Sequence, residues 1–104
     1  MPTVYITAPP DAAADLASQL VEERLAACVN RVRCRSTYRW EGEIHDDDEV
    51  VLLAKTTEGT CDELMARVEE LHPYDVPCIE RFEVADTTES FAEWLGAAVD
   101  SVED

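Results

Sequence analysis

Lysine is almost missing from this chain of 104 residues. Lys55 is the only one, and it stands with seven arginines against 24 aspartates and glutamates. The net charge of −16 argues against nucleic acid and anionic membranes as partners, because both repel so acidic a surface. A compact chain of this charge also repels itself, and concentrated salt screens that repulsion. The composition therefore favours a salt-loving host; an acidic protein from an ordinary host is the alternative.

Long apolar runs and targeting signals are missing as well. No stretch approaches the roughly 18 apolar residues of a membrane span. The N-terminal MPTVYITAPP lacks the basic region and apolar core of a signal peptide. We therefore expect a cytoplasmic protein, with one domain spanning residues 1–104.

The four cysteines form no recognisable framework. Cys28, Cys34, Cys61 and Cys78 show neither a CxxC pair nor zinc-ribbon spacing. Isolated cysteines in a cytosolic chain are mostly small buried hydrophobic residues, so we interpret these as free thiols.

The first third of the chain predicts a strand and then a helix. Residues 3–8 are rich in β-forming types and end at two prolines, which predicts a strand. Asp11 is the expected N-cap of a helix that continues to about Ala27. Its apolar side chains fall at helical spacing: Ala17, Leu20, Val21, Leu25 and Cys28.

The middle of the chain predicts a long β-hairpin. From Cys28 to Trp40 the side chains alternate, with Arg31, Arg33, Arg35 and Arg39 on one face and Val32, Cys34, Tyr38 and Trp40 on the other. Glu41-Gly42 predicts a two-residue turn, after which the chain returns through an acidic run to Lys55. This register places Arg35 opposite Asp48 and Tyr38 opposite His45.

The last part predicts a helix, a loop, an edge strand and a final helix. A capping box from Thr60 to Glu63 opens the first helix, whose apolar residues are Cys61, Leu64, Val68 and Leu71. The loop HPYDVP precedes a strand over residues 78–85. A second box, from Asp86 to Glu89, opens the final helix, with Phe91, Leu95, Ala98 and Val102 facing inward.

This order, βαββαβ plus a C-terminal helix, predicts an α+β fold of the ferredoxin-like type. Its antiparallel sheet carries two helices on one face. The hairpin strands, about 12 residues each, exceed the usual length of about 5–6. Their ends must project beyond the sheet or pair with another chain.

The arginine stripe has two interpretations. Its members can pair with the acidic run across the hairpin or between subunits, or they can form a pocket for an anion such as a phosphate or nucleotide. No glycine-rich phosphate loop accompanies the stripe, so we favour ion pairing.

His72 is the main candidate for a metal ligand. Pro73 blocks further helix and holds His72 extended, and imidazole suits copper, zinc and nickel. Cys78 or Asp75 could complete the site. The alternative is that His72 and Tyr74 hydrogen-bond the loop backbone. Nucleophilic catalysis by His72 and Cys78 lacks a recognisable oxyanion hole, so we do not expect an enzyme.

Five segments together resemble the CutA family of divalent-cation-tolerance proteins. They are RLAACVN (24–30), STYRWEGEI (36–44), EVVLLAKT (49–56), LHPYDVP (71–77) and FAEWL (91–95), in the family's order and spacing. The resemblance implies a ferredoxin-like subunit in a tight homotrimer whose long hairpin strands pair between subunits. It also implies a link to copper and other divalent metal ions.

The resemblance carries over little of a binding site. His72 matches the histidine of the family's HPY segment, which belongs to a proposed copper site in some members. Such a site also uses a cysteine in the first strand and a histidine just before HPY, where this chain has Ile6 and Leu71. Cys78 stands where the family usually has an acid, and either replaces a missing ligand or is a packed thiol. We expect a divalent cation to bind; the rival hypothesis is a ligand-sensing module resembling nitrogen-regulatory proteins.

Overall fold

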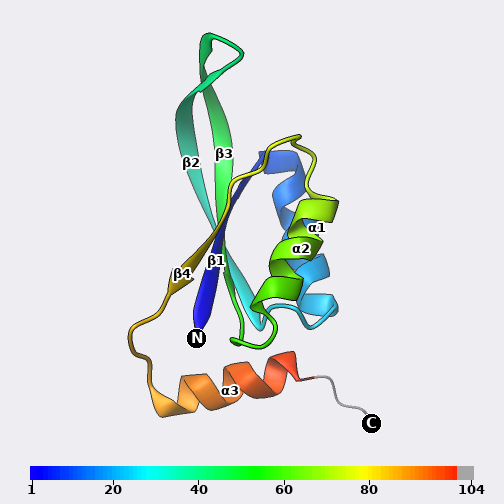
Figure 1. The fold of residues 1–104 in the computed structure, drawn as a ribbon, viewed down its shortest axis with the longest axis vertical. Coiled ribbons are helices and arrows are strands. Elements are labelled where there is room, and N and C mark those ends of the chain that lie inside the picture. The colour runs from blue at the N-terminus through cyan, green and yellow to red at the C-terminus, as the bar shows by residue number, and fades with distance from the viewer. Residues whose placement is uncertain (101–104) are drawn as a thin grey trace.

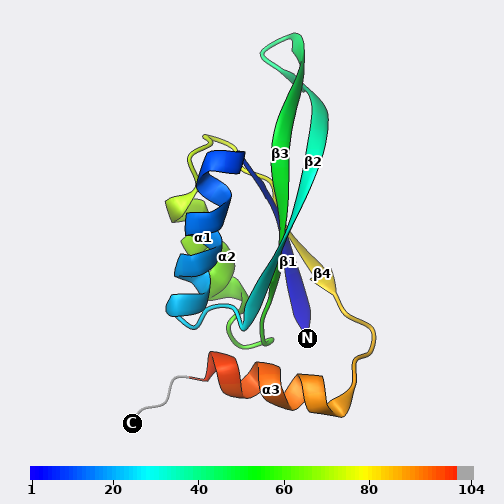
Figure 2. The ribbon, with the colours of Figure 1, turned by 180° about the vertical axis from the view of Figure 1, so that it is seen from behind.

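The computed structural model describes residues 1–100 as one four-stranded sheet with three helices (Figure 1). Along the chain the elements are β1 (Pro2–Ala8), α1 (Pro10–Glu22), β2 (Cys28–Trp40), β3 (Glu43–Lys55), α2 (Cys61–Leu71), β4 (Ile79–Glu83) and α3 (Glu89–Val99). The strand order is β2-β3-β1-β4, and every neighbouring pair is antiparallel. Helices α1 and α2 lie on the same side of the sheet, and α3 lies at its lower end (Figures 1 and 2). The predicted α+β, ferredoxin-like fold is confirmed.

The core lies between the sheet and its two helices. Alternate side chains of the central strands point toward the helices, as the strand repeat of two dictates. Ile6 of β1 and Leu52 of β3 are paired in register and fully buried. Leu20 of α1 and Leu64 of α2 close the core from the helix side. The opposite face of the sheet is covered by neither helix.

The β2–β3 hairpin projects far beyond the rest of the sheet (Figure 1). Each strand has 13 residues, and the molecule measures 49 Å along its longest axis. Glu41 and Gly42 form the turn with φ of 51° and 83°, the positive values that a tight hairpin turn requires. The predicted pairings of Arg35 with Asp48 and of Tyr38 with His45 are both confirmed.

Helix α1 differs from the prediction at both ends. Pro9 is the N-cap and Pro10 the first helical residue, while Asp11 lies in the first turn and caps nothing. The helix ends at Glu22, not near Ala27. The amide of Arg24, whose φ is 61°, donates to the carbonyl of Val21, and the amide of Leu25 donates to that of Leu20. These two bonds form a Schellman motif, which normally has glycine at the left-handed position.

The predicted capping boxes are also wrong in detail. Thr60 precedes α2, but its hydroxyl accepts a hydrogen bond from Thr57 and caps no amide. Thr88, not Asp86, caps α3, and its hydroxyl accepts from the amide of Phe91 at 3.4 Å. On the inward side of α3, Leu95 and Val99 are buried, and Phe91 and Ala98 pack against them. Val102 lies outside the described residues. Strand β4 is an edge strand as predicted, although it ends at Glu83 instead of residue 85.

Candidate functional site

His72 ends α2 and turns its imidazole into the protein. Its backbone is extended, with φ −72° and ψ 137°, as the following proline predicts. Only 8% of the residue is exposed. Its Nε2 lies 2.8 Å from the carbonyl oxygen of Thr7, and the amide of Tyr74 donates to Nδ1 at 3.2 Å. A carbonyl at one nitrogen and an amide at the other fix a neutral ring that carries its proton on Nε2.

Tyr74 attaches the same loop to the sheet at a second point. Its hydroxyl donates to Oε2 of Glu49 in β3 at 2.8 Å. Glu49 is only 7% exposed, although it is an acid on the face that no helix covers. Desolvation, and then the hydrogen bond to Glu49, raise the pKa of the Tyr74 hydroxyl well above its ordinary value. Tyr74 is therefore a hydrogen-bond donor throughout the physiological pH range.

Cys78 follows the loop and lies near Thr7 of β1. It is exposed and forms no disulfide. Desolvation of the thiol, followed by the charge of Glu80, raises its pKa. A thiol must lose its proton to bind a metal, so this environment opposes binding at neutral pH. Within residues 1–100, no three His, Cys, Asp or Glu side chains are grouped so that they could hold a metal ion.

A half-open cavity of about 550 Å³ lies between this loop and the hairpin, on the face of the sheet that no helix covers. Its lining is mostly aromatic and acidic. The residues are Tyr5, Thr7, Ser36, Tyr38, Trp40, Glu49, Tyr74, Asp75, Val76 and Cys78. His72 is not among them. The alternation of β2 predicted that Tyr38 and Trp40 lie on the same face of the strand. That Glu49 also lines the cavity was not predicted.

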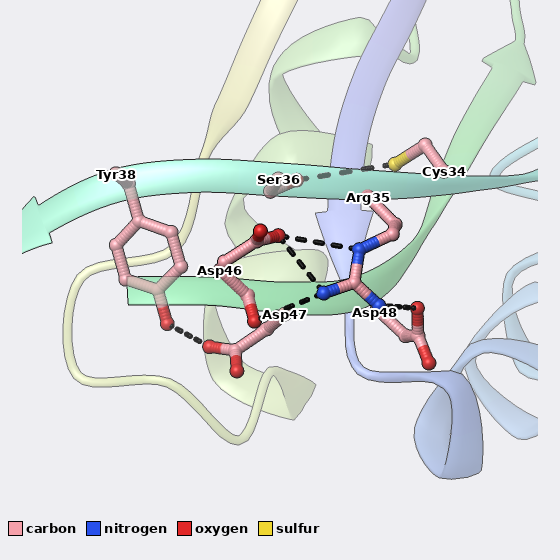
Figure 3. Close-up of polar contacts among 7 residues, drawn as sticks. All are labelled: Cys34, Arg35, Ser36, Tyr38, Asp46, Asp47 and Asp48. Atoms are coloured by element: carbon pink, nitrogen blue, oxygen red, sulfur yellow. Dashed lines mark hydrogen bonds and ion pairs between the residues drawn. The ribbon is translucent and has the colours of Figure 1, made fainter. Parts of the chain in front are cut away.

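The arginine stripe is divided between two environments. Arg35 forms ion pairs of 3.0 Å with both Asp46 and Asp48, and the neighbouring Tyr38 hydroxyl donates to Asp47 at 2.6 Å (Figure 3). Cross-strand pairing is therefore confirmed for Arg35.

Arg31 and Arg33 make no salt bridge within residues 1–100. They line a second cavity, of about 430 Å³, beside the N-terminal half of α1. Asp48 and Glu49 also line it, so its charge is mixed.

In the described part of the chain, no helix is long and apolar enough to cross a membrane.

Comparison with known proteins gives consistent matches. The family model described as CutA1 divalent ion tolerance protein matches residues 2–98. The divalent-cation tolerance protein CutA of Thermus thermophilus is 47% identical over 94 residues, which cover 88% of this chain and 91% of that protein. The crystal structure of CutA1 from Pyrococcus horikoshii has a TM-score of 0.93 and 41% identity, and it covers 97% of this chain and 100% of its own. A structure of the PII-like protein CutA from Nostoc sp. PCC 7120 in apo form has a TM-score of 0.92 and 30% identity, covering 96% and 98%.

Proposed function

Because this chain belongs to the CutA1 family of divalent ion tolerance proteins, we propose that it acts in metal tolerance as a homotrimer that binds a divalent cation, with copper the first candidate. The family description supports a divalent metal ion as the ligand. It names tolerance of such ions and no chemical reaction. The proposal therefore includes no catalytic step.

The proposed ligands are His72 and Cys78. The observation that supports them is their common neighbour, Thr7: its carbonyl contacts the imidazole at 2.8 Å, and Thr7 and Cys78 line the same cavity. Both ring nitrogens of His72 are already hydrogen-bonded, so a metal must displace Thr7 or the Tyr74 amide. We therefore expect weak binding, unlike that of a structural zinc site.

Calorimetry with Cu(II) and Zn(II) tests this site. The parent should bind, His72→Ala and Cys78→Ser should each bind less tightly, and His45→Ala is the matched control for a histidine on the hairpin. Binding should weaken as the pH falls, because protons compete with the metal for the imidazole and the thiolate. If His72→Ala binds as well as the parent, the histidine is purely structural and the proposed site is wrong.

The projecting hairpin supports the homotrimer. In the part of the chain that the structure describes, residues 43–49 of β3 pair only with β2, so one chain supplies no further strand beside this part of the hairpin. The uncovered face of the sheet also carries exposed Val32 and Phe82, at 52% and 45%. Apolar surface of this kind is typical of subunit contacts. Light scattering in high salt should give about three times the 11.6 kDa of one chain. A monomer mass at micromolar concentration would contradict the assembly.

A ligand-sensing function is the second candidate. It is supported by the likeness to a protein titled PII-like and by Arg31 and Arg33, which have no salt-bridge partner within residues 1–100 and line the second cavity. Thermal-shift measurements with nucleotides and inorganic phosphate would test it. A shift that is lost in Arg33→Gln and kept in Arg39→Gln would support this function, and the absence of any shift would reject it.

We also propose a cytoplasmic setting. All four cysteines are unpaired, which suits a reducing compartment. Titration of the unfolded, unreduced protein with the thiol reagent DTNB should detect four thiols per chain. Fewer thiols would point to disulfides and an oxidising compartment.

A further inference from the structure

The helix layer carries a groove of about 580 Å³ between the start of α1 and the end of α2, which we call the helix groove. Its lining comes from α1 and the residue before it, and from Leu71 and Pro73 at the end of α2. None of these residues belongs to the sheet or to the hairpin. The proposed homotrimer makes its contacts through the hairpin and the uncovered face of the sheet, and the helices lie on the other side (Figures 1 and 2). Those contacts therefore leave the helix groove open.

The floor of the helix groove is apolar. Leu16 of α1 is buried in the main core, and Leu71 of α2 packs against that core from the other side of the groove. Ala12 contributes only a methyl group, which leaves room above Leu16. Pro9 and Pro73 stand at the two ends of the helices, and their rings fix the backbone there. A concave apolar surface held by rigid elements can seat a bulky apolar side chain of a partner.

Two carboxylates stand beside this floor. Asp11 and Asp15 lie one turn apart on α1, so their Cβ atoms are about 5–6 Å apart on the same face of the helix. Both residues are exposed, and neither forms a salt bridge within residues 1–100. Glu23, at the far end of α1, is in contrast paired with Arg67 at 2.8 Å. Among residues 1–100, no lysine or arginine lines the groove, so the charge of these two carboxylates is not compensated locally.

From the apolar floor and the two carboxylates we propose that the helix groove docks a segment of a partner protein in which a bulky apolar side chain stands between arginines. The planar guanidinium group pairs with a carboxylate through two parallel hydrogen bonds and is more weakly hydrated than an ammonium group. The carboxylates therefore select the basic flanks by charge complementarity, and the floor selects the apolar residue between them. This partner goes beyond the proposed binding of a divalent cation and does not depend on it.

An array of immobilised octapeptides tests the chemistry of the partner. Each peptide places leucine, phenylalanine, methionine or serine between flanks of arginine, citrulline or glutamate. The full-length protein is applied in its native assembly with EDTA present, so that no metal contributes. Peptides with an apolar centre and arginine flanks should be retained most strongly. Citrulline keeps the shape of arginine without its charge, so citrulline peptides should be retained less, as should arginine peptides with a serine centre.

Fluorescence anisotropy with the tightest arginine peptide then locates the site on the protein. Ala12→Met fills the groove with a side chain that suits a helix, and the affinity should fall at least about fivefold. Ala14→Met is the matched control, because Ala14 is exposed on the same helix but does not line the groove; it should leave the affinity unchanged.

A second pair of variants examines the charge. Asp15→Asn should weaken binding of the same peptide roughly two- to fivefold, whereas Glu93→Gln, which removes the same charge from α3, should have no effect. Asp15 is a better choice than Asp11, because an acid in the first turn also stabilises the helix itself.

Four results would overturn the proposal. Equal retention of arginine and citrulline peptides would show that charge is not recognised. Equal effects of Asp15→Asn and Glu93→Gln would reduce the binding to a general attraction between a basic peptide and an acidic surface. An Ala12→Met variant that binds as tightly as Ala14→Met would place the peptide elsewhere. Retention of no peptide at all would remove the docking site.

Discussion

At the scale of single residues, Thr56 joins two segments that are distant in sequence. It is fully buried, and its hydroxyl donates to the carbonyl of Leu25 at 2.7 Å, in the turn that follows α1. Thr56→Val keeps the shape and leaves that buried carbonyl without this bond. We expect the free energy of unfolding to fall by about 1–3 kcal/mol in urea denaturation. Thr56→Ser, which retains the hydroxyl, should lose less; equal losses would show that the bond contributes nothing.

The ion pair of Arg67 with Glu23 predicts a dependence on pH. The guanidinium contacts both carboxylate oxygens, at 2.8 and 2.9 Å, and holds the pKa of Glu23 at about 2, below the ordinary 4.5. The folded pKa is the lower one, so this stabilisation is present above about pH 4.5 and is lost as pH falls toward 2.

The matching experiment compares the parent with Glu23→Gln. The parent should melt at a higher temperature near pH 6, and the difference should shrink steadily from about pH 5 to pH 2. Using the difference between two proteins removes the general effect of acid on so negative a chain. A difference that stays constant with pH would contradict the role of the Glu23 charge.

At the scale of elements, the hairpin turn is conformationally demanding. Gly42 has φ +83°, and a Cβ there would meet nothing within 4 Å, so the cost of Gly42→Ala is purely conformational. We expect it to lower the free energy of unfolding by about 1–2 kcal/mol. Glu41 also has positive φ, at 51°, and Glu41→Asn should stabilise, because asparagine tolerates this region. Urea denaturation checks both, and a stabilising Gly42→Ala together with a destabilising Glu41→Asn would show that the turn adopts another type in solution.

The elements differ in how far sequence could predict them. The hairpin was predictable to the residue, because a period of two over 13 residues and a Glu-Gly turn allow one register. The end of α1 was not, because Leu25 continues the helical spacing although it packs beyond the helix. The stop is made by Arg24 in a left-handed conformation, and arginine, unlike glycine, gives no sign of it.

The candidate site shows the same division. The extended backbone of His72 follows from Pro73, a neighbour in sequence. Its contact with Thr7 and the Tyr74–Glu49 bond join residues 65 and 25 positions apart, respectively. Such contacts depend on how α2 and the loop pack on the sheet, which periodicity does not specify. The cavity between the loop and the hairpin is lined from β1, β2, β3 and the loop, so its full lining could not be predicted from the pattern of one strand.

At the scale of the whole molecule, charge dominates. The chain carries −16, the proposed homotrimer triples that charge, and most of the acids lie on the surface. The Debye length falls from about 10 Å at 0.1 M salt to about 3 Å at 1 M, so distant like charges stop repelling each other as salt is added. We expect the melting temperature to rise by at least about 5 °C between 0.1 and 2 M KCl.

A charge-reduced variant separates this repulsion from other effects of salt. Asp15, Glu69 and Glu93 are exposed and take part in no salt bridge within residues 1–100. The triple variant Asp15→Asn, Glu69→Gln, Glu93→Gln should melt higher than the parent at 0.1 M KCl, because fewer like charges are compressed into the same surface. At 2 M KCl the two curves should converge, since screening has already removed the repulsion that the variant relieves. A flat or falling melting temperature of the parent in KCl, or a variant advantage that persists at high salt, would contradict a surface adapted to salt.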